Sequence, residues 1–339
     1  MASRTLVSGA LLALALQLTI WSAPAAGQQY DWTYERPDGV APASLFATRV
    51  LPAGVVQIAP QFRSFDHTGT RFGSEFISYE ELLGLFEEVP FAMSSDLFAA
   101  DVSFGVTPEF TLLARVGWLD NTREVVDQDL QILTLENDGI TDVEVHGLYQ
   151  VYAEGPWRAH LSGGLSLPTG SVDDEDGVFR SGPLPYDMQT GAGVVGLLPG
   201  ATVQTMNEHG SVGMQVTGRI YVGENDRGWR PGNGVQAAAW ASYRFNRFFS
   251  VSSGVYARAW NPIEGFDPDL HPERDPGELP SSFGGERVDI PLGVNLRLPE
   301  GPLAGHRLGV DFLFNVHEDL DGPWLAADDG FTITWTKAF

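Results

Sequence analysis

The sequence contains no cysteine and a single lysine, Lys337, so nineteen of its twenty basic residues are arginine. Without cysteine, the protein can form no disulfide scaffold, no thiolate metal site and no cysteine nucleophile. Positive charge is also scarce, because 44 acidic residues outnumber 20 basic ones and give a formal net charge of −24. A surface this acidic repels phosphate backbones, and we therefore expect no nucleic-acid partner.

Downstream of the N-terminus, apolar runs long enough to span a membrane as a helix are missing. The longest uncharged stretch there, 189–207, is interrupted by Pro199 and several glycines. Residues 1–26 are predicted to be an export signal, because Arg4 precedes an apolar core and small residues at 23–25 supply a cleavage pattern. This core is shorter than the ~20 residues that a spanning helix needs. We therefore expect a cleaved signal peptide and a mature protein without a transmembrane helix.

From Val55 onward the sequence alternates between apolar and polar residues with a period of two. In 288–298, every even-numbered residue is apolar, and Asp289, Asn295 and Arg297 lie between them. This alternation is typical of a strand with one apolar and one polar face. Twelve candidate strands of ~10 to 14 residues result, each long enough to cross a bilayer when tilted. They are 54–65, 96–106, 109–119, 140–153, 157–168, 192–206, 210–223, 234–246, 248–260, 287–298, 306–317 and 328–339.

The connections between these strands alternate between short and long. Short turns are expected at 107–109, 154–156, 207–209, 246–247 and 299–305, and long loops at 66–95, 120–139, 169–191, 224–233, 261–286 and 318–327. A membrane barrel has short periplasmic turns and long extracellular loops, whereas a soluble sandwich or lipocalin-like barrel has no reason to sort its connections. The sequence therefore predicts an all-β fold, a single transmembrane antiparallel up-and-down β-barrel of about 12 strands. We expect a signal peptide at 1–26, a periplasmic N-terminal segment at 27–53 and the outer-membrane barrel at 54–339.

The polar face of these strands carries large ionisable residues, as expected for a wet lumen. The predicted pore-lining residues are Arg63, Asp101, Arg115, Glu144, Arg158, Arg219, Arg244, Arg258, Asp289, Arg297 and Asp311. Arg219, Arg244 and Arg258 come from three successive strands and are expected to form a basic stripe on one wall. Each arginine could instead pair with a neighbouring acid. The long loops are acidic and are expected to form a negative mouth above this wall.

Two loop features leave alternatives open. Ser78 followed by Glu81 forms a capping box ahead of an amphipathic stretch that ends before Pro90, which predicts a short helix. This helix could rest on the rim or fold into the lumen as a constriction. The acidic run of Asp173, Asp174, Glu175 and Asp176 is predicted to be a solvated loop, with a calcium site as the alternative.

The pair of His160 and Ser162 on one strand face superficially suggests a hydrolase. Hydrolysis would also need a group to orient the histidine and an oxyanion hole, and neither is evident in the sequence. We therefore expect no catalytic centre, no cofactor and no metal site, and the protein is predicted not to be an enzyme.

Several strings from the fifth strand onward resemble one known family. They are LSLPTGSVD (165–173), LPYDMQTGAG (184–193), LLPG (197–200), GENDRGWRPG (223–232), DPDLHP (267–272), PEGPLAGHRL (299–308) and DLDGP (319–323). In these strings the chain resembles the outer-membrane transporter family named for the MetA pathway of phenol degradation. The resemblance implies an outer-membrane barrel of the transporter type, with no established substrate.

Together these features predict a porin-like channel in the outer membrane of a Gram-negative cell, passing a small solute down its gradient. The expected partners are outer-membrane lipid, the solute, and the barrel-assembly machinery, which would read the C-terminal strand ending in Phe339. One alternative is a plugged structural or adhesive barrel, filled by side chains or by loop 66–95. An outer-membrane hydrolase is a further alternative.

Overall fold

The computed structural model describes residues 32–175 and 182–339. The expected signal peptide and Asp176 lie outside these described residues. The strands are β1 (Val56–Gly73), β2 (Glu75–Ile77), β3 (Glu88–Gly105), β4 (Phe110–Asp127), β5 (Ile132–Ile140), β6 (Val143–Glu154), β7 (Trp157–Leu167), β8 (Val195–Leu197), β9 (Gly200–Met206), β10 (Gly210–Val222), β11 (Trp229–Arg230), β12 (Gly234–Arg244), β13 (Phe249–Trp260), β14 (Glu264–Gly265), β15 (Gly285–Arg297) and β16 (His306–Ala338). The helices are α2 (Tyr79–Leu82) and the single 3-10 turns η1 (Tyr186–Met188), η2 (Pro276–Glu278) and η3 (Pro280–Phe283).

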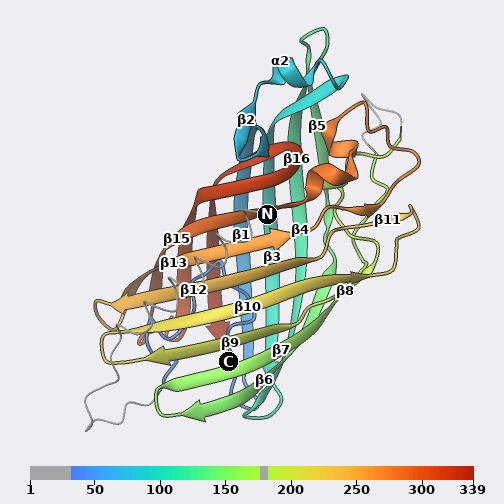
Figure 1. Ribbon diagram of the computed structural model, residues 1–339. Helices are drawn as coiled ribbons and strands as arrows, with labels where there is room; N and C mark the ends of the chain where they lie inside the picture. Colours follow the sequence, from blue (N-terminus) through green and yellow to red (C-terminus); the bar gives the residue numbers. More distant parts are fainter. Residues whose placement is uncertain (1–31, 176–181) are drawn as a thin grey trace.

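Antiparallel pairing of neighbours closes the sheet into a barrel (Figure 1). The wall follows the order β1, β3, β4, β6, β7, β9, β10, β12, β13, β15 and β16 before returning to β1. Residues 307–320 of β16 pair with β15 and residues 320–338 pair with β1, so β16 contains an ascending and a descending run. These runs correspond to two expected strands, 306–317 and 328–339. The prediction of an all-β antiparallel barrel with about 12 crossings is confirmed.

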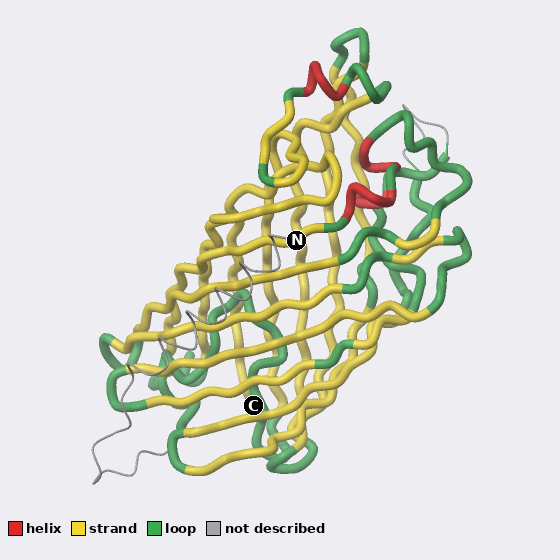
Figure 2. The backbone as a smooth tube through the Cα atoms, in the orientation of Figure 1, coloured by secondary structure: helices red, strands yellow, loops and turns green. Residues whose placement is uncertain are grey.

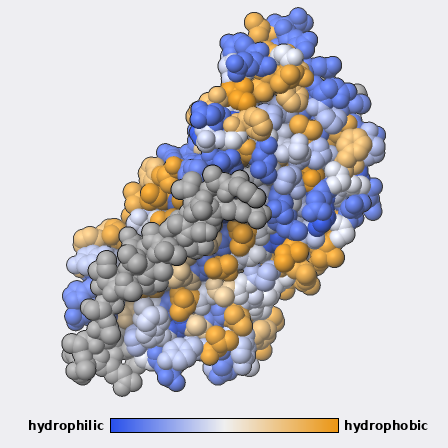
Figure 3. Space-filling model, in the orientation of Figure 1, coloured by the Kyte–Doolittle hydropathy of each residue, from blue (hydrophilic) through white to orange (hydrophobic). Residues whose placement is uncertain are grey.

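The apolar face of the alternation points outward and the polar face inward. Phe98, Val216 and Phe312 are each about half exposed on the outer wall, at 53%, 48% and 53%. Figure 3 shows hydrophobic side chains spread over the barrel wall and hydrophilic ones most frequent around the end with the long connections. An outer surface of this kind suits hydrocarbon rather than water. None of the described helices is long and apolar enough to cross a membrane.

Several expected loops are strand over most of their length. At the end that carries the long connections, the loop end (Figure 2), β1, β3, β4 and β5 extend through much of 66–95 and 120–139, and β16 continues through 318–327. Hairpins there satisfy backbone hydrogen bonds beyond the expected strand ends. The expected strand 192–206 is instead divided into β8 and β9, because Pro199 between them cannot donate a ladder hydrogen bond.

The N-terminal segment differs most from expectation. The sequence predicts a periplasmic segment at 27–53, but the described residues 32–55, here called the plug segment, run into the barrel from the short-turn end. Its apolar residues explain this position, since Ala41 and Leu45 pack against Trp240 and Tyr256 of the inner wall. These contacts remove apolar surface of both the segment and the inner wall from water, which is favourable.

Candidate transport cavity

Side chains from around the barrel hold the plug segment by its backbone. Gln61 on β1, Gln204 on β9 and Gln215 on β10 donate amide hydrogen bonds to the carbonyl oxygens of the plug segment. The bonds are Gln61 Nε2 to Ala43 at 2.9 Å, Gln204 Nε2 to Thr48 at 2.7 Å and Gln215 Nε2 to Phe46 at 2.8 Å. Between β1 and β9 in the wall, β4 also contributes, because the Leu51 amide donates to the Thr111 hydroxyl of β4 at 2.8 Å. Because these contacts come from four different strands of the barrel wall, the plug segment crosses the lumen.

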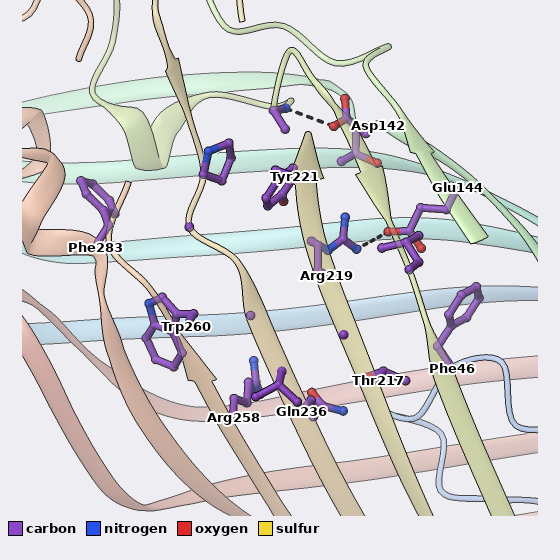
Figure 4. A pocket seen from close by; sticks show the side chains of 18 of the residues that line it. Phe46, Asp142, Glu144, Thr217, Arg219, Tyr221, Gln236, Arg258, Trp260 and Phe283 are labelled. Carbon is purple, nitrogen blue, oxygen red and sulfur yellow. Dashed lines mark hydrogen bonds and ion pairs between the residues drawn. The ribbon is translucent and has the colours of Figure 1, made fainter. Parts of the chain in front are cut away.

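A cavity of about 880 Å³ lies between the plug segment and the long loops, and is called the loop-side cavity below. Phe46 and Ala47 of the plug segment form part of its floor, and the strands β4, β6, β10, β12 and β13 contribute its walls. Figure 4 shows Arg219, Gln236, Arg258 and Trp260 around this space. A second cavity of about 110 Å³ lies on the other side of Phe46 and Ala47. The plug segment therefore separates the two cavities.

Four aromatic rings from the loops and β16 form the roof of the loop-side cavity. Tyr186 of η1 contacts Trp229 of β11 and Phe283 of η3, with ring centroids 4.8 and 5.8 Å apart. Phe283 also contacts Trp324 of β16 at 4.7 Å. Burial raises the pKa of the Tyr186 phenol above its ordinary value. The neutral hydroxyl accepts a hydrogen bond from the Asp267 amide at 2.9 Å, which fixes the loop against the roof.

Buried ion pairs anchor the loops above this roof. Arg123 on β4 reaches Asp275 with 2.6 Å between Nη2 and Oδ1, and its Nε lies 3.6 Å from the Asp187 carboxylate. These two carboxylates belong to different loops, so a single guanidinium ties both loops to the wall. Nearby, hydrogen bonding to Asp267 raises the pKa of the Arg227 guanidinium and keeps it charged.

Five of the predicted pore-lining residues line the loop-side cavity: Arg63, Arg115, Glu144, Arg219 and Arg258. Most of them are paired with acids. Arg115 binds Asp101 with two hydrogen bonds of 2.6 and 2.8 Å, and Arg219 forms an ion pair with Glu144. Arg258 lies 3.1 Å from the carboxylate of Asp289. The pairing alternative considered from the sequence therefore describes most of this wall.

Asp101 and Asp289 are the partners of Arg115 and Arg258, whereas Arg158, Arg244, Arg297 and Asp311 lie nearer the short-turn end. Asp311 accepts hydrogen bonds from the Ser44 amide at 2.7 Å and hydroxyl at 2.6 Å. Arg297 pairs with Glu35 of the plug segment, and Arg158 donates to the Gly155 carbonyl. These contacts serve the plug segment and the turns rather than the loop-side cavity.

The expected basic stripe does not form. Arg219 and Arg258 lie near one level, but the guanidinium of Arg244 donates to the Glu208 carbonyl at the short-turn end of β12. The alternation in the sequence predicts the face of each residue, but it does not give the height of that residue in the barrel. That height depends on the strand register.

Sequence reasoning missed part of the cavity lining. Arg287 lines the loop-side cavity beside Asp289. It lies two residues before Asp289 in β15, so the alternation of the sequence already predicted that it faces inward. Trp260 on β13 could have been found in the same way, because it follows Arg258 on the inward face. The roof residues Tyr186, Trp229 and Phe283 carry no such signal, since they lie outside regular strands of the wall.

The other features singled out from the sequence, the histidine on the fifth strand, the capped helix and the acidic loop, take part in structural contacts. His160 Nε2 lies 3.0 Å from the Ala47 carbonyl oxygen, so this histidine contacts the plug segment. The helix α2 lies at the rim, where Ser78 caps it by accepting from the Glu81 amide and Leu82 packs against Val126. Asp174 accepts from Asn137 at 2.9 Å. Over the described parts of the chain, no group of three or more His, Asp or Glu side chains is arranged to hold a metal ion.

Two comparisons bear out the fold and the resemblance. Residues 95–261 match the model of the family described as "Putative MetA-pathway of phenol degradation". The crystal structure of an outer membrane channel from Pseudomonas putida F1 superimposes with a TM-score of 0.59 at 12% identity, covering 88% of this chain and 100% of that one. At this identity the likeness shows the fold. No curated protein matches the chain in sequence.

Other solved barrels are more distant in structure. The transport unit of the autotransporter AIDA-I from Escherichia coli has a TM-score of 0.43 at 11% identity, covering 90% of this chain and 98% of that one. A FadL homologue from Pseudomonas aeruginosa has a TM-score of 0.38 at 10% identity, covering 93% and 96%.

Proposed function

We propose, from the family match and the barrel fold, that this chain is an outer-membrane channel for a small solute. The observation that carries the proposal is the loop-side cavity of about 880 Å³, which lies within the size range of small-molecule sites. A barrel with a purely structural role could fill this space with side chains. Here the wall instead presents arginines and aromatic rings to an open volume.

In this proposal the described conformation is the closed state, and the plug segment is the gate. Gln61, Gln204 and Gln215 hold it by neutral hydrogen bonds to its carbonyl groups, which water can replace when the segment moves. Each such bond contributes only about 0.5 to 1.5 kcal/mol net. Displacing the plug segment would join the two cavities and open a path to the short-turn end.

Cross-linking tests this gate directly, because the chain has no cysteine of its own. The Ser44 hydroxyl lies 2.6 Å from the Asp311 carboxylate, so the double variant Ser44→Cys with Asp311→Cys places two thiols on the plug segment and the wall. In planar bilayers, the reduced double variant should conduct ions and the oxidised one should not, with reduction restoring conductance. The two single variants serve as controls.

Two outcomes would contradict the proposal. Conductance that persists in the fully oxidised variant would mean that solutes do not need the plug segment to move. A wild-type protein that never conducts would favour the plugged structural or adhesive barrel, with the filling supplied by residues 32–55 rather than by loop 66–95.

We also propose that the barrel-assembly machinery recognises the C-terminal strand. Phe339 is 69% exposed, and its backbone exchanges hydrogen bonds of 2.8 and 3.2 Å with Val56 at the seam where the barrel closes. Phe339→Ala should reduce the amount of barrel inserted in cells without changing its folding into detergent from urea. An equal loss in both measurements would assign Phe339 to barrel stability instead.

A further inference from the structure

One side of the loop-side cavity gathers positive charge. Arg258 on β13 and Arg287 on β15 are directly opposite each other in the strand register, and both line the cavity. Like charges at such positions destabilise a sheet. A single carboxylate lies between them, since Asp289 is 3.1 Å from Arg258 Nη2 and 2.6 Å from Arg287 Nε. The two cations therefore share one ion-pair partner, while Glu318 of β16 is opposite Arg287 on its other side.

Arg63 adds a third guanidinium to this side. Within the described chain it forms no ion pair shorter than 4.0 Å, and its hydrogen bond goes to the Ser44 carbonyl at 3.0 Å. Its Nε is buried without a hydrogen-bond partner. Arg63 and Arg287 lie 5.8 and 5.9 Å from the centre of the same Phe65 ring, so both flank one side chain. Burying donors in this way is unfavourable unless water or a ligand completes their hydrogen bonds.

Three of the four acids that line the cavity have their partners away from these arginines, and the fourth, Glu318, is opposite Arg287 in the strand register. Their partners are Arg219 and His146 for Glu144, the Gly170 and Ala192 amides for Asp142, the Ala327 amide for Glu318, and Arg123 for Asp187. Asp311, below the floor, accepts from Ser44. The positive charge around Arg63, Arg258 and Arg287 is therefore only partly neutralised.

Flat apolar side chains complete the site. Trp260 follows Arg258 by two residues on the inward face of β13, and Phe283 lies in the roof above (Figure 4). Trp324 of β16 packs against Phe283. Aromatic rings pack favourably against other flat apolar groups in offset or edge-on contacts. The cavity thus offers guanidinium groups on one side and aromatic surfaces nearby.

We propose that Arg63, Arg258 and Arg287 form an anion subsite that binds a small organic carboxylate with a flat, apolar body. The planar guanidinium group matches a carboxylate with two parallel hydrogen bonds, which a lysine could not provide. The carboxylate would accept hydrogen bonds from the guanidinium of Arg63, and the apolar body would lie against the aromatic rings. This inference names the solute class of the proposed channel, and it rests on that function.

Benzoate is the probe, with benzyl alcohol as its uncharged counterpart and acetate as the carboxylate without a ring. Calorimetry on the full-length protein in detergent should show benzoate binding at least tenfold more tightly than either analogue. Arg63→Gln should weaken benzoate binding about tenfold or more and leave benzyl alcohol unchanged. Arg247→Gln is the matched control, because Arg247 is exposed at a turn and pairs with Glu300.

A second variant changes affinity in the opposite direction. Asp289→Asn removes the shared carboxylate, so Arg258 and Arg287 would both be free for the ligand and benzoate should bind more tightly. Equal binding of benzoate and benzyl alcohol, or benzoate binding that Arg63→Gln leaves intact, would overturn the inference.

The two proposals fail separately, because binding is measured without passage through the barrel. A protein that conducts ions but binds no benzoate would refute the anion subsite and leave the channel intact. Benzoate binding by a protein that never conducts would refute the channel and leave the anion subsite in place.

Discussion

Arg123 on β4 and Asp275 at the start of η2 are 152 residues apart in sequence, yet they form a fully buried ion pair with 2.6 Å between Nη2 and Oδ1. This contact joins the loop 261–284 to the opposite part of the barrel wall. The same guanidinium approaches Asp187 of the loop that carries η1. One arginine side chain therefore ties two of the loops that form the roof to the barrel wall.

Loss of this arginine should release the roof. Arg123→Gln removes a charged partner of the buried Asp275 carboxylate, and breaking a buried ion pair in this way typically costs about 3 to 5 kcal/mol. We expect a matching drop in the free energy of unfolding by urea in lipid vesicles, together with faster proteolysis within 261–284. Arg247→Gln, at an exposed ion pair, should change little. Unchanged proteolysis in Arg123→Gln would show that other contacts hold the loop.

Weakening the plug segment should open the channel more often. Gln204→Leu combined with Gln215→Leu removes two amide donors to plug carbonyl groups at similar side-chain volume. At about 1 kcal/mol per bond, the closed state should lose about 2 kcal/mol, or roughly thirtyfold in the ratio of closed to open channels. Single-channel recording measures this ratio.

The control for the plug variants is Gln236→Leu, since Gln236 lines the loop-side cavity and none of the hydrogen bonds described for the plug segment involves it. It should leave the open probability near that of the wild type. If the double variant and this control behave alike, the plug contacts do not set the closed state.

The two faces of β10 should respond differently to charge. Val216 is 48% exposed on the outer wall, whereas Thr217 lines the loop-side cavity. Val216→Arg places a cation against hydrocarbon, at a cost of about 2 to 4 kcal/mol near the bilayer midplane, while Thr217→Arg remains in contact with water. Folding into vesicles, followed by gel mobility, should be impaired more in the first variant. Equal impairment would contradict the assigned faces.

The orientation in the membrane can be tested by labelling single cysteines. Glu273, in the loop before η2, and Glu208, at a short turn, are both exposed. An impermeant maleimide added to intact cells should label Glu273→Cys, and should label Glu208→Cys only after the outer membrane is permeabilised. The cysteine-free wild type gives the background. The reverse pattern would invert the barrel.

Much of the fold could be predicted from the sequence because strand faces are a local property. In β10, Val216 and Thr217 face opposite sides simply because successive side chains alternate across a strand. The cap at Ser78 is equally local, since its oxygen accepts from an amide three residues ahead. Pro199 shows the limit of such local patterns. It separates β8 from β9, yet the alternation of the residues around it predicts one continuous strand.

The sequence by itself determined the alternating strands, the sorted connections and the inward-facing charges, each of which follows from neighbouring residues. Only the tertiary structure decided what occupies the lumen. The plug segment is held by hydrogen bonds from strands up to 291 residues away, as in the bond from the Thr334 hydroxyl to the Ala43 carbonyl. The grouping of Arg63 with Arg258 and Arg287 likewise depends on strand register and barrel closure. The alternation along a single strand carries no information about such contacts, because they form only when distant strands bring their residues to the same height in the barrel.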